Sequence, residues 1–229
     1  MRIAERYRTI GDLPRQIPIF PLRNAILLPR AVLPLNIFEP RYLAMVDFAI
    51  RSDRIIGMIQ PSGAVSVTGS PRERDAKLWR VGCMGRITAF QEREDGRLLI
   101  TLTGIARFRP GAEVTSELPY RQVIVDSSDY ADDLTPGIGA NAVDRPRLLG
   151  VLKSYLEQKQ LAADWSAIQQ AESERLVNAL SVLAPYSAEE KQALIEAKLL
   201  TERAELLIAL AEMELAAARG GGGPGNIMQ

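Results

Sequence analysis

The sequence contains no histidine among its 229 residues and a single cysteine, Cys83. Without histidine, the chain cannot build a Ser-His-Asp or Cys-His site, or a zinc or iron centre with imidazole ligands. One cysteine supplies neither a thiolate metal cluster nor an internal disulfide. A Ser-Lys dyad is still conceivable, but four of the five lysines, Lys191 among them, fall on helix faces that we expect to be exposed. We therefore expect no catalytic residues, no metal and no cofactor.

Long apolar runs are also missing. The most apolar stretch near the end of the chain, LLIALAEMELAAA, contains two glutamates, whereas a membrane-spanning helix needs about 20 predominantly apolar residues. The N-terminal MRIAERYRTIGDLPRQ is polar from its first residues and has no cleavage site of small residues, which argues against export. Together with the lone cysteine, these features predict a soluble, cytoplasmic protein.

The formal net charge is zero, but the two halves of the chain carry opposite charge. Residues 1–125 sum to +7 and residues 126–229 to −7. A basic face on the first half would suit acidic partners or nucleic acid. Alternatively, the halves attract each other, or their solvated surfaces simply differ in sign. The arginines are scattered instead of forming a basic run, which favours the second interpretation.

The first half of the chain has the pattern of short apolar strands separated by prolines and glycines. Proline recurs every few residues in IPIFPL and AILLPRAVLPLNIF. Proline at this density forbids a helix and confines these pieces to sheet edges, bulges and turns. RIIGMIQP and YRQVIV predict further strands, and SGAVSVTGSPRERD predicts a polar loop with a weak strand inside it.

The clearest strand signal surrounds Asp95-Gly96. This pair supplies the positive backbone angles of a tight hairpin, and apolar residues alternate on both sides of it. Gly82 and Gly85 before the turn, and Gly104 after it, predict bulges or sharp bends of the kind that curl a sheet into a barrel. The first half should therefore form a mostly antiparallel, strongly curved sheet with one helix attached.

That helix follows the unusual stretch PLNIFEPRY, residues 34–42. Pro40 fits the first turn of a helix, where its missing N–H is no loss. The apolar face of this short helix comprises Leu43, Val46, Ala49 and Ile50.

Within the same stretch, we expect Phe38 to be buried beneath the helix and Tyr42 to pack on the sheet. Glu39 and Arg41 are placed to form an ion pair that pins the corner. We favour a structural role, because residues that restrict φ at this density fix a turn. The functional alternative is that Arg41 and Tyr42 edge a groove for polypeptide, which makes Phe38, Arg41 and Tyr42 the candidate binding residues.

The second half of the chain is predicted to be helical. The acidic, Gly- and Pro-rich SSDYADDLTPGIGANAVDRP precedes it and predicts a linker. Asp164 can cap one helix, and Pro185 ends the next. The capping box at residues 187–190 then opens a helix of about 30 residues, some 45 Å long, with a bend near Thr201.

Three further features carry no specific signal for chemistry. GGGGPG at Gly220 lacks the flanking strand, helix and Lys-Ser/Thr pair of a phosphate-binding loop. The acidic pair Asp132-Asp133 lies in the linker, where loop chemistry explains it, and Cys83 is typical of a small core residue. ARFRPGAEVTSELPYRQ mixes arginines with aromatics and would suit single-stranded nucleic acid, but arginine at sheet edges also prevents aggregation.

The order of these motifs resembles the N-terminal substrate-recognition domain of the Lon ATP-dependent proteases. The resemblance extends from about Leu13 to Leu215, and rests on FPL…LP…LPLNIFEPRY followed by the later G-x-x-RF. It implies an α+β fold: a PUA-like antiparallel β pseudo-barrel followed by a C-terminal α-helical bundle. The positions that carry the structural signature are Pro21, Pro34, Glu39, Pro40, Gly104, Arg107 and Phe108.

The resemblance also implies a domain organisation. We expect residues 1–128 to form the barrel, 129–145 an acidic linker, 146–218 the helical bundle and 219–229 a flexible Gly-rich tail. No G-x-x-x-x-G-K-[ST] motif occurs in the sequence. We therefore expect a stand-alone domain of the bacterial type, without the ATPase and protease domains of a complete Lon, and not an enzyme.

The function that the resemblance implies is recognition of unfolded or exposed polypeptide segments, or docking to a protease or chaperone partner. Extended segments bind naturally to open sheet edges and apolar grooves. RNA binding through the PUA-like barrel is the alternative, and we consider nucleic acid the less favoured partner because the arginines are scattered. The oligomeric state stays open, since the last helix can either pack in the core or associate with a second copy.

Overall fold

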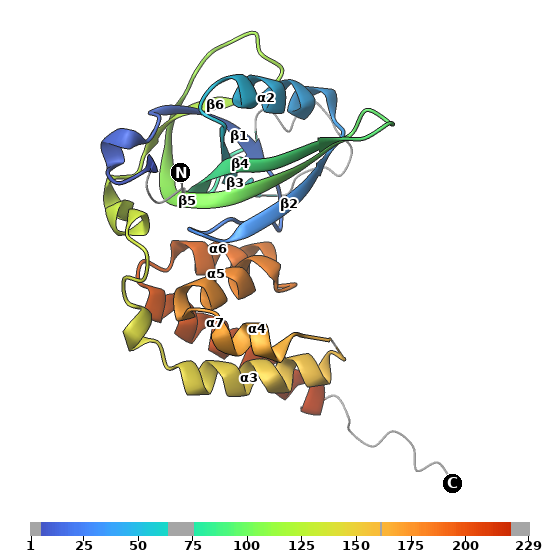
Figure 1. Cartoon of the computed structure of the whole chain (residues 1–229), viewed down its shortest axis with the longest axis vertical. Helices are drawn as coiled ribbons and strands as arrows, with labels where there is room; N and C mark the ends of the chain where they lie inside the picture. Colours follow the sequence, from blue (N-terminus) through green and yellow to red (C-terminus); the bar gives the residue numbers. More distant parts are fainter. Residues whose placement is uncertain (1–5, 64–75, 161, 221–229) are drawn as a thin grey trace.

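The computed structural model describes residues 6–63, 76–160 and 162–220 (Figure 1). The strands are β1 (Gln16–Pro21), β2 (Val32–Ile37), β3 (Ile55–Ile59), β4 (Gly82–Glu92), β5 (Leu98–Glu113) and β6 (Gln122–Asp126). The α-helices are α2 (Pro40–Arg51), α3 (Arg145–Gln158), α4 (Trp165–Gln170), α5 (Ser173–Leu183), α6 (Ala188–Glu196) and α7 (Leu200–Gly220). Short 3₁₀ helices are η1 (Ile10–Asp12), η3 (Ser128–Leu134) and η4 (Ala140–Ala142).

The six strands form one sheet in the order β2-β5-β4-β3-β1-β6, and an additional pairing of β5 with β6 closes it into a near-complete ring. This is the curved, mostly antiparallel sheet predicted from the sequence, followed by a helical region, so the α+β fold class is confirmed. The β1–β3 pair is parallel, which the strand pattern did not indicate. The chain between them passes through β2 and α2, a connection long enough to return β3 in the direction of β1.

The hairpin predicted at Asp95-Gly96 joins β4 and β5, and Gly96 adopts a φ of 76°. β5 is the longest strand, and its two parts have different partners. Its first part pairs with β2 as far as Thr103 opposite Val32, and its last part pairs with β6. The register of β4 against β5 shifts between Met84 and Gly85, in agreement with the bulge predicted there.

Gly104 lies where the segment before β2 crosses β5. Its N–H donates to the Ala31 carbonyl at 2.9 Å, and its own carbonyl accepts from the Arg30 N–H at 2.9 Å. A Cβ placed on Gly104 would lie 2.0 Å from the carbonyl oxygen of Leu28. Glycine is therefore required here for the close approach of two backbone segments.

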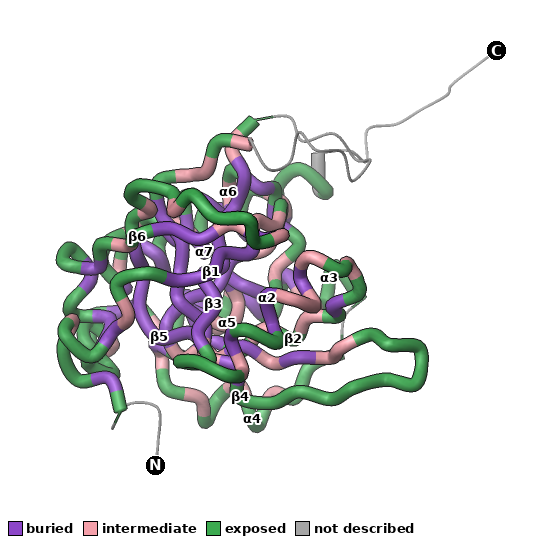
Figure 2. Tube along the Cα trace, turned by 90° about the horizontal axis from the view of Figure 1, so that it is seen from above, coloured by how far each residue is buried: buried purple, intermediate pink, exposed green. Residues whose placement is uncertain are grey.

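The helices of the second half pack against one side of the barrel, and α2 covers the opposite side (Figure 1). One apolar cluster runs without interruption from the barrel into the helical region, and a second fills the remaining part of the barrel around Phe108. Figure 2 shows the buried residues concentrated along the strands and on the inner sides of the helices. Because one core is continuous between the two regions, their packing is linked.

Two of the predicted helix caps are confirmed. Asp164 accepts a hydrogen bond from the Ala167 N–H at the start of α4, and the box between Ser187 and Glu190 opens α6. The prediction of one long terminal helix is wrong, because α6 ends at Glu196 and α7 begins at Leu200. Arginine side chains bind the backbone carbonyls around this break, as described below, and so replace the helical partners of those carbonyls.

None of the helices within the described ranges is long and apolar enough to cross a membrane. The predicted loop with a weak strand falls mostly on residues 64–75, outside the described residues. Most of the predicted Gly-rich tail, residues 221–229, also lies outside them, and α7 reaches Gly220.

Replacement of Gly104 by alanine should destabilise the protein by about 3 kcal/mol, because the new methyl group overlaps backbone atoms that cannot move aside. Gly150→Ala is the matched control. It adds the same methyl group to an exposed position in α3 with no heavy atom within 4 Å, and should stabilise by about 0.5 to 1 kcal/mol. Urea unfolding of both variants measures the difference, and equal stabilities would contradict the proposed backbone crossing.

Candidate functional site

A groove of about 360 Å³ opens at the surface beside the corner that follows β2. Three elements form it: the end of β1, the end of β2 and the first turn of α2. Its lining is largely apolar and includes all three candidate binding residues, Phe38, Arg41 and Tyr42. The lining residues are Phe20, Pro21, Leu22, Arg23, Leu35, Asn36, Ile37, Phe38, Glu39, Arg41, Tyr42, Pro61 and Ala76.

The helix that borders the groove is fixed by its buried face. Pro40 occupies the first turn of α2, as predicted. The Tyr42 ring packs on Phe20 of β1 with the ring centroids 4.2 Å apart, which confirms the predicted contact with the sheet. The buried positions of α2 are Tyr42, Met45, Val46 and Ala49, so the predicted apolar face is correct for its two central members.

The predicted ion pair between Glu39 and Arg41 is confirmed. The Arg41 guanidinium donates from Nη2 and Nε to Glu39 Oε2 at 2.7 and 3.0 Å. It also lies over the ring of Tyr42, 4.5 Å from the centroid. This arrangement holds a cation over an aromatic face at the mouth of the groove, and it fixes the chain direction at the start of α2.

The prediction that Phe38 is buried is wrong, because its side chain is 62% exposed at the groove. Successive residues of a strand point to opposite faces. Ile37, the last residue of β2, takes the buried position and is 1% exposed, so the next side chain is directed away from the core. A large aromatic side chain therefore stands in solvent beside an apolar groove.

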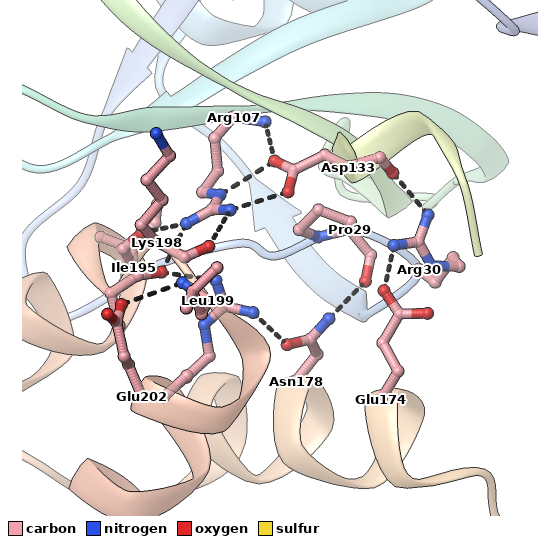
Figure 3. A network of polar contacts seen from close by, with 12 residues as sticks. Pro29, Arg30, Arg107, Asp133, Glu174, Asn178, Ile195, Lys198, Leu199 and Glu202 are labelled. Carbon is pink, nitrogen blue, oxygen red and sulfur yellow. Dashed lines mark hydrogen bonds and ion pairs between the residues drawn. The ribbon is translucent and has the colours of Figure 1, made fainter. Parts of the chain in front are cut away.

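The signature arginine Arg107 lies away from this groove, between the barrel and the helical region (Figure 3). It is 4% exposed. Its guanidinium donates to both carboxylate oxygens of Asp133, from Nε at 2.9 Å and from Nη2 at 2.8 Å. Its remaining N–H groups donate to the carbonyls of Ile195, Ala197 and Lys198. All five guanidinium donors are thus used.

These contacts also account for the charge of Arg107. Burial opposes the charged form, but the hydrogen bonds and the negative charge of Asp133 outweigh it and raise the pKa of Arg107. The three carbonyls belong to the end of α6 and the break before α7. One side chain from β5 therefore binds η3, through Asp133, and the helix break at the same time.

A second set of polar contacts also joins the helices to the barrel, through the segment before β2 (Figure 3). Arg203 of α7 donates to Asn178 Oδ1 at 2.7 Å, and Asn178 Nδ2 donates to the Pro29 carbonyl at 3.0 Å. Nearby, Arg30 forms an ion pair with Glu174 of α5. Burial, reinforced by the positive charge of Arg107, lowers the pKa of Arg203 to about 10, so this side chain is still charged at neutral pH.

The other signature residues occupy structural positions. Phe108 is fully buried in the barrel, Pro21 ends β1, and Pro34 lies within β2. Sequence reasoning missed the buried polar contacts that join the barrel to the helical region. Gln60 donates to the Ala188 carbonyl at 2.8 Å, and no periodic pattern marks such a contact. These partners are more than a hundred residues apart in the chain, so only the folded structure brings them together.

Asp133 shows what the sequence did and did not indicate. The sequence predicts that loop chemistry explains the acidic pair at 132–133, but Asp133 is 7% exposed and bound to Arg107. The acidic pair in YADDL does not indicate which basic residue Asp133 meets. The partner had to come from the tertiary structure.

The arginines of the predicted nucleic-acid segment are engaged with carboxylates. Arg109 pairs with Asp129 at 2.9 Å, and Arg121 pairs with Glu113. Arg107 is buried, as described above. These ion pairs neutralise the positive charge that a phosphate backbone would need.

Cys83 is fully buried, as predicted, and burial raises the pKa of its thiol far above the usual value. Lys191 contradicts the prediction of an exposed side chain. It is 7% exposed and donates to the Val182 carbonyl at 2.9 Å, and burial lowers its pKa. Across the described ranges, no group of three or more Cys, Asp or Glu side chains is placed to hold a metal ion.

Comparison with known proteins gives a consistent result. Residues 16–212 match the model of the ATP-dependent protease La (LON) substrate-binding domain. The chain is 27% identical over 203 residues to Lon protease 2 of Myxococcus xanthus, and 29% identical over 196 residues to Lon protease of Flavobacterium johnsoniae. These alignments cover 87% and 84% of this chain, but only 24% and 23% of the relatives. The chain therefore spans about a quarter of their length.

Two solved structures share the fold. The Lon N-terminal domain protein from Xanthomonas campestris superposes with a TM-score of 0.53 at 24% identity, covering 85% of this chain and 97% of that chain. The N-terminal domain of Lon protease from the Mycobacterium avium complex superposes with a TM-score of 0.62 at 17% identity, covering 86% and 98%. Nearly all of each domain is thus matched.

The Asp133→Asn variant should lose about 3 kcal/mol of stability, because it leaves the buried Arg107 cation without a counter-charge. Asp129→Asn is the matched control: it makes the same change in the same 3₁₀ helix, but its pair with Arg109 is exposed. Its stability should be nearly unchanged. Chemical denaturation compares the two, and a similar loss in both would show that burial of the pair is not the cause.

Proposed function

The chain belongs to the family of Lon substrate-binding domains, and on that premise we propose that it binds unfolded or exposed polypeptide segments in the groove beside β2. The bound segment would be extended, and binding would use apolar side chains more than a fixed sequence. The affinity would be weak and the sequence preference loose, because apolar contacts of this kind do not depend on a fixed sequence.

The observation that carries this proposal is the exposure of Phe38. Phe38 is 62% exposed and lines a groove whose walls are largely apolar, so its ring extends the apolar surface that a ligand can contact. Tyr42 and Phe20 provide a rigid aromatic floor, since they pack together at 4.2 Å. Arg41, held by its ion pair with Glu39, lies beside that floor, and an incoming aromatic side chain would contact its guanidinium.

We further propose that the chain itself does not catalyse a reaction. The matched part corresponds to the substrate-binding domain, about a quarter of the curated relatives. Hydrolysis of ATP and cleavage of polypeptide would belong to a protease or chaperone partner. Nucleic acid would be a poor ligand, because Arg109 and Arg121 are paired with acids.

The Phe38→Ala variant should bind unfolded polypeptide about 30-fold more weakly, since loss of a phenyl ring that becomes buried under the bound segment costs about 2 kcal/mol. Fluorescence anisotropy with a fluorescein-labelled, reduced and alkylated protein as the probe measures this loss. Phe90→Ala is the control, because Phe90 is 56% exposed in β4 and lies outside the groove. It should leave binding unchanged.

Three outcomes would contradict the proposal. The first is that the wild-type chain fails to bind the probe, and the second is that the two phenylalanine variants bind it equally. The third is that a labelled single-stranded RNA binds more tightly than the probe, with a steep loss of affinity on addition of salt. The last outcome would support the RNA alternative.

A further inference from the structure

β2 is bound on one side only. It pairs with β5 over all six of its residues, without a register shift, and no other strand in the described part of the chain pairs with it. Figure 1 shows it at the margin of the sheet. The barrel therefore keeps one open edge, although β5 and β6 close the ring elsewhere.

The hydrogen-bond pattern shows which backbone groups are on that edge. The Gly104 N–H donates to the Ala31 carbonyl, so residue 31 directs its backbone toward β5. In an antiparallel pair, alternate residues face the partner strand. Leu33 and Leu35 therefore face β5 as well, whereas the backbone groups of the even-numbered residues are directed outward. The outward residues are Val32, Pro34 and Asn36.

The side chains follow the same alternation. Leu33 and Leu35 are half-buried and Ile37 is buried against the core, whereas the three outward residues are exposed. The edge is thus straight and regular, and it leads directly into the groove at Phe38. A strand added to this edge would place its side chains along the groove.

We propose that the bound polypeptide adds to β2 as an extra strand, with backbone hydrogen bonds to the outer edge and an apolar side chain in the groove. This proposal rests on the proposed function and specifies its binding mode. Main-chain recognition of this kind gives affinity without a fixed sequence. Val32 and Asn36 supply N–H donors, and these two residues and Pro34 supply carbonyl acceptors.

Pro34 disfavours a second copy of this chain as the occupant of this edge. If two β2 strands paired across a two-fold axis at this position, the two prolines would face each other and two backbone hydrogen bonds would be lost. A different polypeptide loses one bond at most, because only one of its carbonyls meets the proline. Proline at an outward position therefore favours an unlike strand and opposes self-pairing.

Two substitutions test the proposal in opposite directions in the full chain. Asn36→Pro removes an outward N–H and leaves the hydrogen bonds to β5 in place, so the fold is kept and the labelled probe should bind about 10-fold more weakly. Pro34→Val restores the missing N–H, and should tighten binding about 3-fold. Asn36→Ala removes the side chain but keeps the N–H, so its loss of affinity should be clearly smaller than that of Asn36→Pro. Phe90→Ala, which lies outside the groove, is the control and should bind like the wild type.

The outcomes separate this proposal from the proposed function. If Phe38→Ala weakens binding while Asn36→Pro and Pro34→Val leave it unchanged, strand addition is overturned and binding in the groove stands. Equal losses in Asn36→Ala and Asn36→Pro would also overturn it, because the side chain would then be responsible. If the wild type does not bind the probe, both proposals fail. Thermal melting of each variant verifies that the fold is intact.

Discussion

The buried ion pair between Arg107 and Asp133 is the interaction on which the relation of barrel and helices depends. The Arg107 guanidinium donates two hydrogen bonds to the Asp133 carboxylate, and its other N–H groups donate to carbonyls at the break between α6 and α7. A charge taken out of water is stable only with such complete pairing. These carbonyls lie at the end of α6 and before the start of α7, so a residue of the barrel binds the break between the two helices.

The length of β5 is the second constraint. Because β5 extends beyond β2, its last part is available to β6, and the ring closes there. The same geometry leaves the outer side of β2 without a partner strand among the described residues. The corner at Pro40 then turns the chain into α2 and leaves Phe38 beside the groove. The pairing of β6 with β5 therefore both closes the barrel and leaves the outer edge of β2 open.

Local features of the site were predictable from the sequence. Proline and glycine positions indicated the strand pieces, the hairpin at Gly96 and the helix that begins at Pro40, because these residues restrict φ or permit positive φ wherever they occur. The pair of Glu39 and Arg41 was predictable because the residues are neighbours. The exposure of Phe38 was not, since it depends on which face of β2 meets the core, and that is decided by pairing with β5.

The sequence by itself determined the order of strands and helices, the caps and turns, the absence of histidine chemistry and the resemblance to a family. Each of these depends on residues close together in the chain or on composition. Only the tertiary structure decided the parallel pairing of β1 with β3, the partner of Arg107, the burial of Lys191 and the break before α7. These features depend on burial and on side-chain pairing, and both exist only after the chain has folded.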